Sequence, residues 1–305
     1  MDKISEETKK QVDQLREWIA TQSHLPKDLE DRIILRFLHS CYYDIEKTKH
    51  TIELFFKIRD NSPELINHRD PLSPAMQKAL KISKMAQYTI SGDRNVWFWQ
   101  LNDPGLEHYD YVQDARMFFM SCDAWMLANN HLAAEDIVVM DTKDITLKFI
   151  TKFNLSVARK LSKYQEEAMP IRLKQIHVIN APPFIDKLFG LMKPILRHEI
   201  TEMIHFHVPK SETLYKFINK EDLPKDYGGT QPSMDELNKK VVDIIMEQRY
   251  DLYKMFFRKI GDPENEKNCR YGVERPADLH AISTFRIMAS DWLKSISSDQ
   301  WLDAQ

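Results

Sequence analysis

Two histidines at alternate positions, His205 and His207, are the first residues of this sequence whose types and spacing could do chemistry. On a strand their imidazoles would share one face and could bind a metal ion. A zinc site needs at least a third protein ligand, however, and no nearby carboxylate–histidine pattern supplies one. We therefore predict that both residues, and His177 with them, are ordinary side chains of core strands and that the chain has no metal site.

Nucleophiles and phosphate-binding loops give no stronger signal. The three cysteines, Cys41, Cys122 and Cys269, are widely spaced, which favours free thiols in a reducing compartment over a disulfide framework. None of the seven glycines has the spacing of a glycine-rich nucleotide-binding loop, and the Gly-x-Ser-x-Gly elbow of α/β-hydrolases is absent. We therefore predict a protein that is not an enzyme and needs no cofactor.

The composition is that of a globular protein without an extreme charge. The 305 residues are 43% hydrophobic and 29% charged, with a net charge of −3. This balance gives no global basic field for nucleic acid. The sequence begins with polar residues, and no apolar run approaches the length needed to span a bilayer. These features predict a cytoplasmic protein of one large domain or two modest ones that has no nucleic-acid partner.

The first third of the chain predicts three short amphipathic helices. Ser5 and Asp44 are typical N-caps for the first and the third. Each helix carries an apolar stripe at helical spacing: Val12, Leu15 and Ile19; Leu29, Ile33, Phe37 and Leu38; and Ile45, Ile52, Phe55 and Phe56. Pro63 is expected to end the third helix, and a proline-rich linker follows.

Beyond the linker the pattern changes to alternating strands and helices. A hairpin is expected with strands at 87–90 and 96–101. Further strands are predicted at 137–140, 175–179 and 203–207, and helices at about 111–130, 146–167, 184–199 and 234–260, with a short helix near 285–293. This alternation predicts an α/β fold with a mixed, mainly parallel sheet and helices packed against it.

Three stretches, in matching order and spacing, resemble the CRAL-TRIO lipid-binding family. Residues 35–39 with 43–48 are similar to its N-terminal helical lobe, and residues 176–182 to its central strand. Residues 222–229 resemble its Leu-Pro-x-Glu-Tyr-Gly-Gly box, with Asp226 in place of the glutamate. The resemblance is closest to the branch of α-tocopherol transfer protein and cellular retinaldehyde-binding protein.

This resemblance implies three parts and a ligand cavity. A helical N-terminal lobe is expected at 1–70, a CRAL-TRIO lipid-binding lobe at 71–260 and a C-terminal extension at 261–305. The resemblance assigns the segment 184–199 the role of a lid helix over the cavity. Its unusually wide apolar sector is compatible with that role and equally with an ordinary buried helix. The ring of Pro194 would collide with the carbonyl of Gly190, so a kink or break is expected there.

The family resemblance also implies which residues hold the ligand. They are apolar positions of the helices and strands around the cavity: Phe118, Cys122, Met140, Ile145, Leu147, Phe153, Leu161, Met169, Ile171, Ile176, Phe189 and Met192. Phe118 and Cys122 stand where the tocopherol carrier has serines. Losing those hydroxyls removes polar anchors, so the ligand is expected to differ from α-tocopherol.

Basic residues suggest a second, weaker site. Arg59, Arg172 and Lys174 match positions that bind phosphoinositide headgroups in the tocopherol-transfer branch, and cationic donors of this kind suit phosphate. Met203 occupies a position that is usually basic in that branch, so we expect only weak binding to anionic lipids.

Together these signals predict a carrier that binds one small hydrophobic lipid, tocopherol-like, retinoid-like or otherwise isoprenoid-like, and transfers it between membranes through transient peripheral contact. The bound lipid would be the only small molecule that the chain needs. An alternative is a lipid-gated regulatory or adaptor protein that signals to a protein partner without net transfer. A third hypothesis, an enzyme acting on a lipid, lacks any recognisable catalytic motif.

Overall fold

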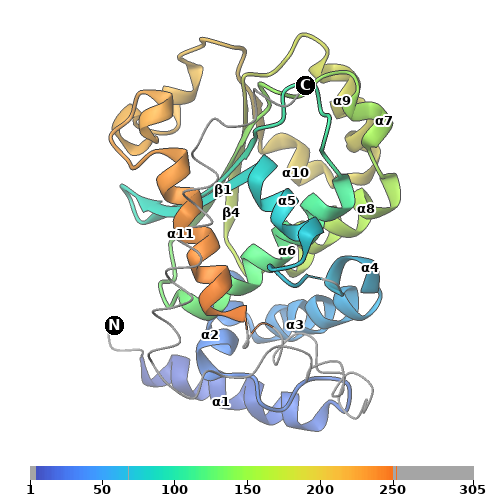
Figure 1. Cartoon of the computed structure of the whole chain (residues 1–305). Coiled ribbons are helices and arrows are strands. Elements are labelled where there is room, and N and C mark those ends of the chain that lie inside the picture. Colours follow the sequence, from blue (N-terminus) through green and yellow to red (C-terminus); the bar gives the residue numbers. More distant parts are fainter. Residues whose placement is uncertain (1–4, 68, 250–251, 253–305) are drawn as a thin grey trace, which may run out of the picture.

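The computed structural model describes residues 5–67, 69–249 and 252, and shows a helical lobe packed beneath an α/β lobe (Figure 1). The helical lobe consists of α1 (Glu6–Thr21), α2 (Asp31–Ser40), α3 (Ile45–Asp60) and the short α4 (Pro63–Ile66). The apolar stripes predicted for α1 and α2 are buried. They form one core that continues into the α/β lobe, because Phe55 of α3 packs beside Tyr164 with ring centroids 5.8 Å apart.

The ends of these helices are set by local chemistry. The Ser5 hydroxyl accepts a hydrogen bond from the Thr8 amide at 3.1 Å, and the Asp44 carboxylate accepts one from the Lys47 amide at 3.0 Å, so both predicted caps are confirmed. Pro63 does not itself end α3, which stops at Asp60. It stands in the first turn of α4, where a missing N–H leaves no hydrogen bond unmade.

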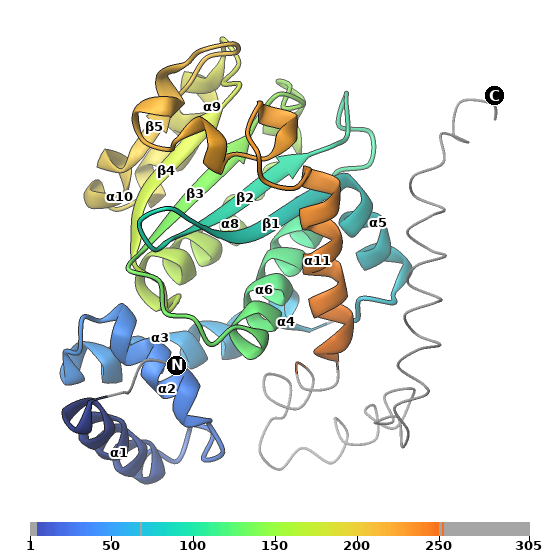
Figure 2. The ribbon, with the colours of Figure 1, turned by 90° about the vertical axis from the view of Figure 1, so that its left-hand side faces the viewer.

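The sheet has five strands in the spatial order β1-β2-β3-β4-β5 (Figure 2). The strands are β1 (Ser83–Ile90), β2 (Arg94–Leu101), β3 (Glu135–Asp141), β4 (Leu173–Ile179) and β5 (Ile204–Phe206). β1 and β2 form the predicted antiparallel hairpin, and the remaining pairs are parallel. The predicted fold class, a mixed and mainly parallel sheet with packed helices, is confirmed.

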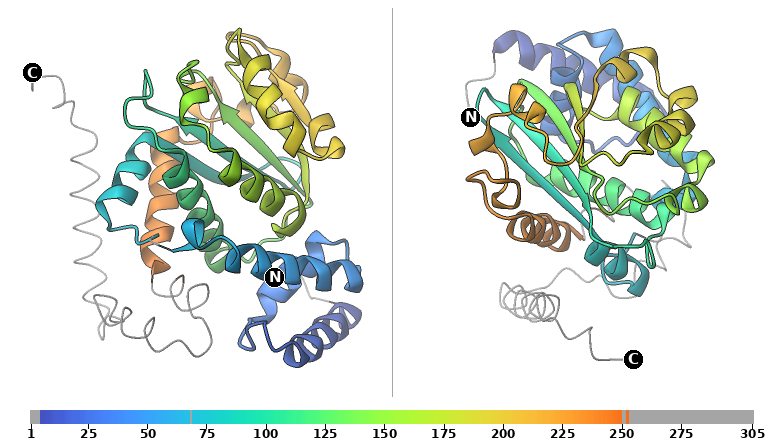
Figure 3. Two further views of the ribbon diagram at one scale, coloured as in Figure 1. Left: turned by 90° about the vertical axis from the view of Figure 1, so that its right-hand side faces the viewer. Right: turned by 90° about the horizontal axis from the view of Figure 1, so that it is seen from above.

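Most of the remaining helices lie on one face of this sheet, and α11 packs along β1 at its edge (Figure 3). They are α5 (Pro74–Ile82), α6 (Tyr111–Ala128), α7 (Phe149–Lys152), α8 (Leu155–Lys163), α9 (Ile185–Met192), α10 (His198–Glu202) and α11 (Met234–Glu247). Five single-turn segments complete the fold: η1 (Tyr164–Ala168), η2 (Lys193–Ile195), η3 (Thr213–Lys216), η4 (Lys220–Asp222) and η5 (Lys225–Tyr227). η1 is a π-helix, and the others are 3₁₀ turns.

Two predicted helices are broken into pieces. The one expected at 146–167 is α7, α8 and η1 in succession. Phe153 is extended, and the Asn154 side chain caps α8 by accepting a hydrogen bond from the Val157 amide at 3.1 Å. The one expected at 184–199 breaks where the kink was predicted: α9 ends at Met192, and Pro194 lies in the 3₁₀ turn that follows.

The Leu-Pro box forms a structural turn on the sheet face opposite α6. The Tyr227 hydroxyl donates to the Asp141 carboxylate at 2.6 Å, and its ring packs on Phe98 with centroids 4.8 Å apart. A Cβ at Gly229 would stand 1.9 Å from the Leu223 carbonyl oxygen, so only glycine fits there. Asp226, which replaces the family's glutamate, accepts a hydrogen bond from the Met234 amide at 2.6 Å and so helps to start α11.

The predicted domain boundaries at residues 70 and 260 stay predictions. The C-terminal extension at 261–305, the short helix near 285–293 and the end of the 234–260 helix lie outside the described residues.

Candidate functional site

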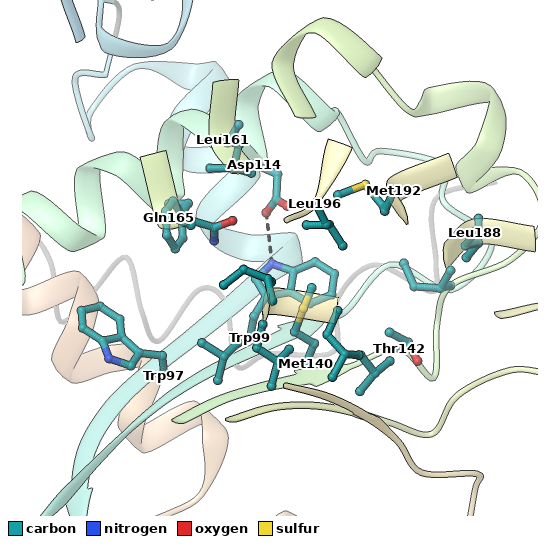
Figure 4. A pocket seen from close by; sticks show the side chains of 18 of the residues that line it. Trp97, Trp99, Asp114, Met140, Thr142, Leu161, Gln165, Leu188, Met192 and Leu196 are labelled. Carbon is teal, nitrogen blue, oxygen red and sulfur yellow. Dashed lines mark hydrogen bonds between the residues drawn. The ribbon is translucent and has the colours of Figure 1, made fainter. Parts of the chain in front are cut away.

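A cavity of about 320 Å³ lies between the sheet and the helices on one of its faces (Figure 4). Its size falls at the lower end of the range of small-molecule sites in proteins. Nearly all of the side chains that line it are apolar or aromatic. The arrangement therefore suits a hydrophobic molecule rather than a polar metabolite.

The floor of the cavity is one face of the sheet. Side chains alternate between faces along a strand, so every second residue of each strand reaches the cavity. The floor consists of Met85 and Gln87 of β1, Trp97 and Trp99 of β2, Val138 and Met140 of β3, Ile176 and Val178 of β4, and Ile204 and Phe206 of β5. All five strands thus contribute.

The lower wall is built by α6 and α8. Tyr111, Asp114, Ala115 and Phe118 of α6 line the cavity at helical spacing, and Leu161 of α8 adds to them. α6 is held firmly, because its other faces are buried against the helical lobe, α5 and α11. This wall has a fixed shape.

The upper wall is the lid, which we define as Ile185–Glu202: α9, η2 and α10. Ile185, Leu188, Phe189, Leu191, Met192, Leu196 and Ile200 of the lid line the cavity. Few polar contacts tie the lid to α8 and η1. The Glu166 carboxylate accepts a hydrogen bond from the Arg197 amide at 3.2 Å. The Ser162 hydroxyl oxygen lies 3.4 Å from the Ile195 carbonyl oxygen, but its proton is donated to Glu166. No lid residue is classed as fully buried.

Most of the predicted ligand-binding residues do surround this cavity. Phe118, Met140, Ile145, Phe153, Leu161, Met169, Ile171, Ile176, Phe189 and Met192 all line it. Two others do not. Cys122 lies one turn beyond Phe118, in the core shared with the helical lobe, and Leu147 is 49% exposed on the surface before α7. Whether the ten cavity residues hold a ligand stays a prediction.

Several lining residues were missed by the sequence reasoning. Figure 4 shows Trp97, Trp99, Asp114 and Leu188 around the cavity, and Tyr111 also lines it. The strand alternation 97–99 and the helical spacing 111–114–118 were available signals. They become informative only once it is known which face of each element meets the cavity.

The structure contradicts one part of the predicted anion site. Arg59 is buried, and its guanidinium donates to both oxygens of Asp123, at 2.5 and 3.0 Å, and to the Tyr164 hydroxyl at 3.0 Å. Asp123 also accepts from Arg69 at 2.8 Å. Since Arg59 joins α3 to α6 inside the core, it cannot meet a lipid headgroup.

The other two basic residues are differently placed. Arg172 and Lys174 lie over the ring of Tyr42, at 4.3 and 5.4 Å from its centroid, and Arg172 also donates to the His39 carbonyl. Tyr42 is 58% exposed and has a left-handed backbone with φ of 56°, a conformation that costs energy in a non-glycine residue. These residues form a small cationic and aromatic patch at the join of the two lobes.

The three histidines lie together behind the sheet. The His177 Nδ1 is 3.1 Å from the His207 Nε2, and the His177 and His205 rings stack with centroids 5.3 Å apart. Burial, followed by the neighbouring imidazoles, lowers the pKa of His177 to about 3. In the part of the chain that the structure describes, no group of His, Cys, Asp and Glu side chains is arranged to hold a metal ion.

Comparisons with known proteins agree with this architecture. Residues 4–76 match the family model of the Pinta-like UBA domain, and residues 91–229 match that of the CRAL/TRIO domain. A human protein named "Alpha-tocopherol transfer protein-like" is 22% identical over 225 residues, which cover 73% of this chain and 66% of the relative. Rat "Clavesin-2" is 24% identical over 210 residues, covering 68% of this chain and 64% of the relative.

A solved structure titled "Crystal structure of Sfh5" covers 82% of this chain and 100% of its own, with a TM-score of 0.47 and 11% identity. Within the described ranges, no helix is long and apolar enough to cross a membrane.

Proposed function

We propose that this chain, whose residues 91–229 form a CRAL/TRIO domain, binds one small hydrophobic lipid in the cavity beneath the lid and carries it between membranes. The ligand would be tocopherol-like, retinoid-like or otherwise isoprenoid-like. The observation that carries the proposal is the cavity itself: an apolar space of about 320 Å³ bounded by a fixed wall and by a weakly tethered lid.

Energetics favour a carrier that works at a membrane surface. A ligand that hides ~400 Å² of apolar surface gains on the order of 10 kcal/mol relative to water, and it gains a similar amount in a bilayer. Exchange between cavity and bilayer is then nearly balanced, whereas release into water is slow. Lid opening would therefore take place in contact with the membrane.

Exposed apolar side chains support a membrane-facing side near the lid. Among the described residues, the exposed large hydrophobic residues other than Tyr42, Tyr43 and Leu72 all fall within residues 147–208: Leu147, Ile150, Leu155, Leu191, Phe206 and Val208. α7 and α9 are neighbours, because Phe149 packs in one cluster with Phe184 and Leu188. We propose that this rim touches the bilayer when the lid opens.

Native mass spectrometry of the purified protein, with extraction of any bound lipid, tests the binding step. One hydrophobic molecule per chain is expected. Vesicle-to-vesicle transfer then separates a carrier from a lipid-gated adaptor. A protein that binds lipid with one-to-one stoichiometry but gives no transfer above the uncatalysed rate would contradict the carrier proposal.

Two leucines of nearly equal exposure provide a matched pair for the membrane step. Leu191 on the lid is 38% exposed, and Leu72 before α5 is 39% exposed. Leu191→Asp is expected to slow transfer roughly tenfold, because a leucine side chain gains ~1.5–3 kcal/mol from apolar burial. Leu72→Asp should leave the rate unchanged. Equal rates for both variants would rule out membrane contact by this rim. Because Leu191 also lines the cavity, equilibrium ligand affinity is measured for both variants, and a matching loss of affinity in Leu191→Asp would assign the slower transfer to ligand binding.

Anionic lipid is a further variable in the same assay. We propose that Arg172 and Lys174 strengthen membrane contact weakly. Changing both to Ala should reduce transfer to vesicles containing phosphoinositide but not to neutral vesicles, and the difference should shrink in high salt.

A further inference from the structure

One carboxyl group in the cavity has no part in the proposed transfer. Asp114 of α6 lines the cavity, and it stands at the boundary to a second, smaller cavity of about 190 Å³ beside α5. Burial raises the pKa of this group. An aliphatic side chain at this position would complete the apolar wall at no desolvation cost, so the carboxyl calls for an explanation.

Hydrogen bonds hold the Asp114 carboxyl in one orientation and leave it able to accept a further hydrogen bond. The Trp99 indole N–H donates to its Oδ1 at 3.2 Å (Figure 4). The Tyr109 hydroxyl donates to its Oδ2 at 3.0 Å. A carboxylate has about four lone-pair sites. The Ser83 hydroxyl also hydrogen-bonds this carboxyl and lowers its pKa, so at least one lone-pair site remains to accept a hydrogen bond from a molecule in the cavity.

In the larger cavity no positive charge accompanies this carboxyl, whereas Lys78 and His108 line the smaller cavity. Lys, Arg and His are absent from the described residues that line the larger cavity. The other acidic residue there, Glu166, has both oxygens engaged, one by the Ser162 hydroxyl and the other by the Arg197 amide. A lipid carrying its own carboxylate or phosphate would bury a negative charge beside Asp114 without a counter-ion, which is strongly unfavourable.

A second polar group points to a ligand with an oxygen atom. The Nε2 amide of Gln87 on β1 is buried and has no hydrogen-bond partner among the described residues. Gln87 lines the same cavity as Asp114. An unpartnered buried donor is costly, and a hydroxyl can both accept from a donor and donate to an acceptor.

We propose that Asp114 accepts a hydrogen bond from the hydroxyl of a neutral lipid alcohol, and so selects alcohols over the corresponding ethers and acids. This inference rests on the proposed lipid-binding function and adds the class of headgroup. Asp114 is then a specificity-determining residue.

Three probes with one hydrocarbon skeleton test the selection: retinol, retinyl methyl ether and retinoic acid. Quenching of tryptophan fluorescence reports binding, because Trp97 and Trp99 line the cavity. The wild type is expected to bind retinol about tenfold more tightly than the ether, as one hydrogen bond to a carboxylate predicts, and to bind the acid more weakly than either.

Two variants of Asp114 and one control variant test whether this residue causes the preference for retinol over the ether and the acid. Asp114→Val should bind retinol and the ether equally. Asp114→Asn keeps the size of the side chain but removes its charge, so retinoic acid should bind more tightly than to the wild type. Glu107→Gln, an exposed carboxylate paired with Lys148 before α6, should leave all three affinities unchanged.

The binding results distinguish a failure of the proposed lipid-binding function from a failure of the headgroup assignment alone. If neither these retinoids nor a tocopherol probe nor any lipid extracted with the purified protein binds the wild type, the proposed function fails and the inference fails with it. If the wild type binds all three probes equally, or binds the acid best, only the assignment of the headgroup is wrong. That comparison uses the wild type alone, so it stands even if a variant fails to fold.

Discussion

The two walls of the cavity are made of similar residues but are held in very different ways. α6 buries residues along most of its length, and its N-cap Asp110 accepts hydrogen bonds from the Val112 and Gln113 amides. The lid has no residue classed as buried, and neither α9 nor α10 has a side-chain cap. Apolar character alone therefore does not distinguish a fixed wall from a movable one.

The two walls differ in how many side chains each packs against on the side that faces away from the cavity. α6 lies between the cavity and the rest of the core, so it cannot move without opening that core. The lid lies between the cavity and solvent, so its opening breaks few contacts beyond those with the ligand. Segments with few buried contacts open at lower free energy than the global unfolding transition. The lid should therefore be the part of the cavity that opens first.

The largest change in the free energy of unfolding is expected when the buried ion pairs of α6, the fixed wall, are removed. Asp123→Ala on α6 removes the carboxylate that both buried guanidinium groups of Arg59 and Arg69 contact, which should lower the free energy of unfolding by about 3–5 kcal/mol. Urea denaturation followed by circular dichroism measures it.

The control for this change is Asp186→Ala on the exposed face of the lid. A surface substitution of this kind should change the free energy of unfolding by no more than about 0.5 kcal/mol. Similar losses in the two variants would show that the two walls do not differ in the way described.

An intermediate effect on the free energy of unfolding is expected from acid, through His177 on β4, the strand that precedes the lid. Because the pKa of His177 is lowered to about 3, the folded state keeps this imidazole neutral while the unfolded chain binds a proton below about 6.5. The stability that His177 contributes is complete above that pH and is lost as the pH falls toward 3. Between pH 6.5 and 4.5 the loss should be roughly 2 kcal/mol.

A variant comparison isolates this contribution, since the buried Asp114 carboxyl has a raised pKa and acts in the opposite direction at low pH. His177→Phe should reduce the pH dependence of the unfolding free energy, whereas His24→Asn, at an exposed site, should not. Part of the dependence should remain, because burial also lowers the pKa of His39 and of His207. An unchanged slope in His177→Phe would refute the role of this histidine.

The smallest change in stability is expected from a substitution that stiffens α9 of the lid. Gly190 is in the middle of α9, and a Cβ there would meet no atom within 4 Å. Gly190→Ala should therefore stabilise the helical lid by up to about 1 kcal/mol. Hydrogen exchange of the α9 amides should slow by up to about fivefold, while the α6 amides of the same sample serve as the internal control. Faster exchange in α9 would contradict the prediction.

Local features of the fold could be predicted from the sequence because each depends on neighbouring residues. The caps at Ser5 and Asp44 need only a side-chain oxygen beside a free amide. The break near Pro194 needs only a proline ring in a helix. The CRAL-TRIO resemblance added the cavity and ten of the residues that line it. It also suggested a surface position for Arg59 that the core contradicts.

What the sequence alone determined, then, was the set of elements, their order and the face of each that is apolar. The tertiary structure decided which polar residues are inside. Arg59 became a buried ion-pair partner because α3 docks on α6 opposite Asp123, and Asp114 became a cavity wall residue because Trp99 and Tyr109 converge on it from other segments. Burial of a charge depends on partners far apart in sequence, and no local pattern records them.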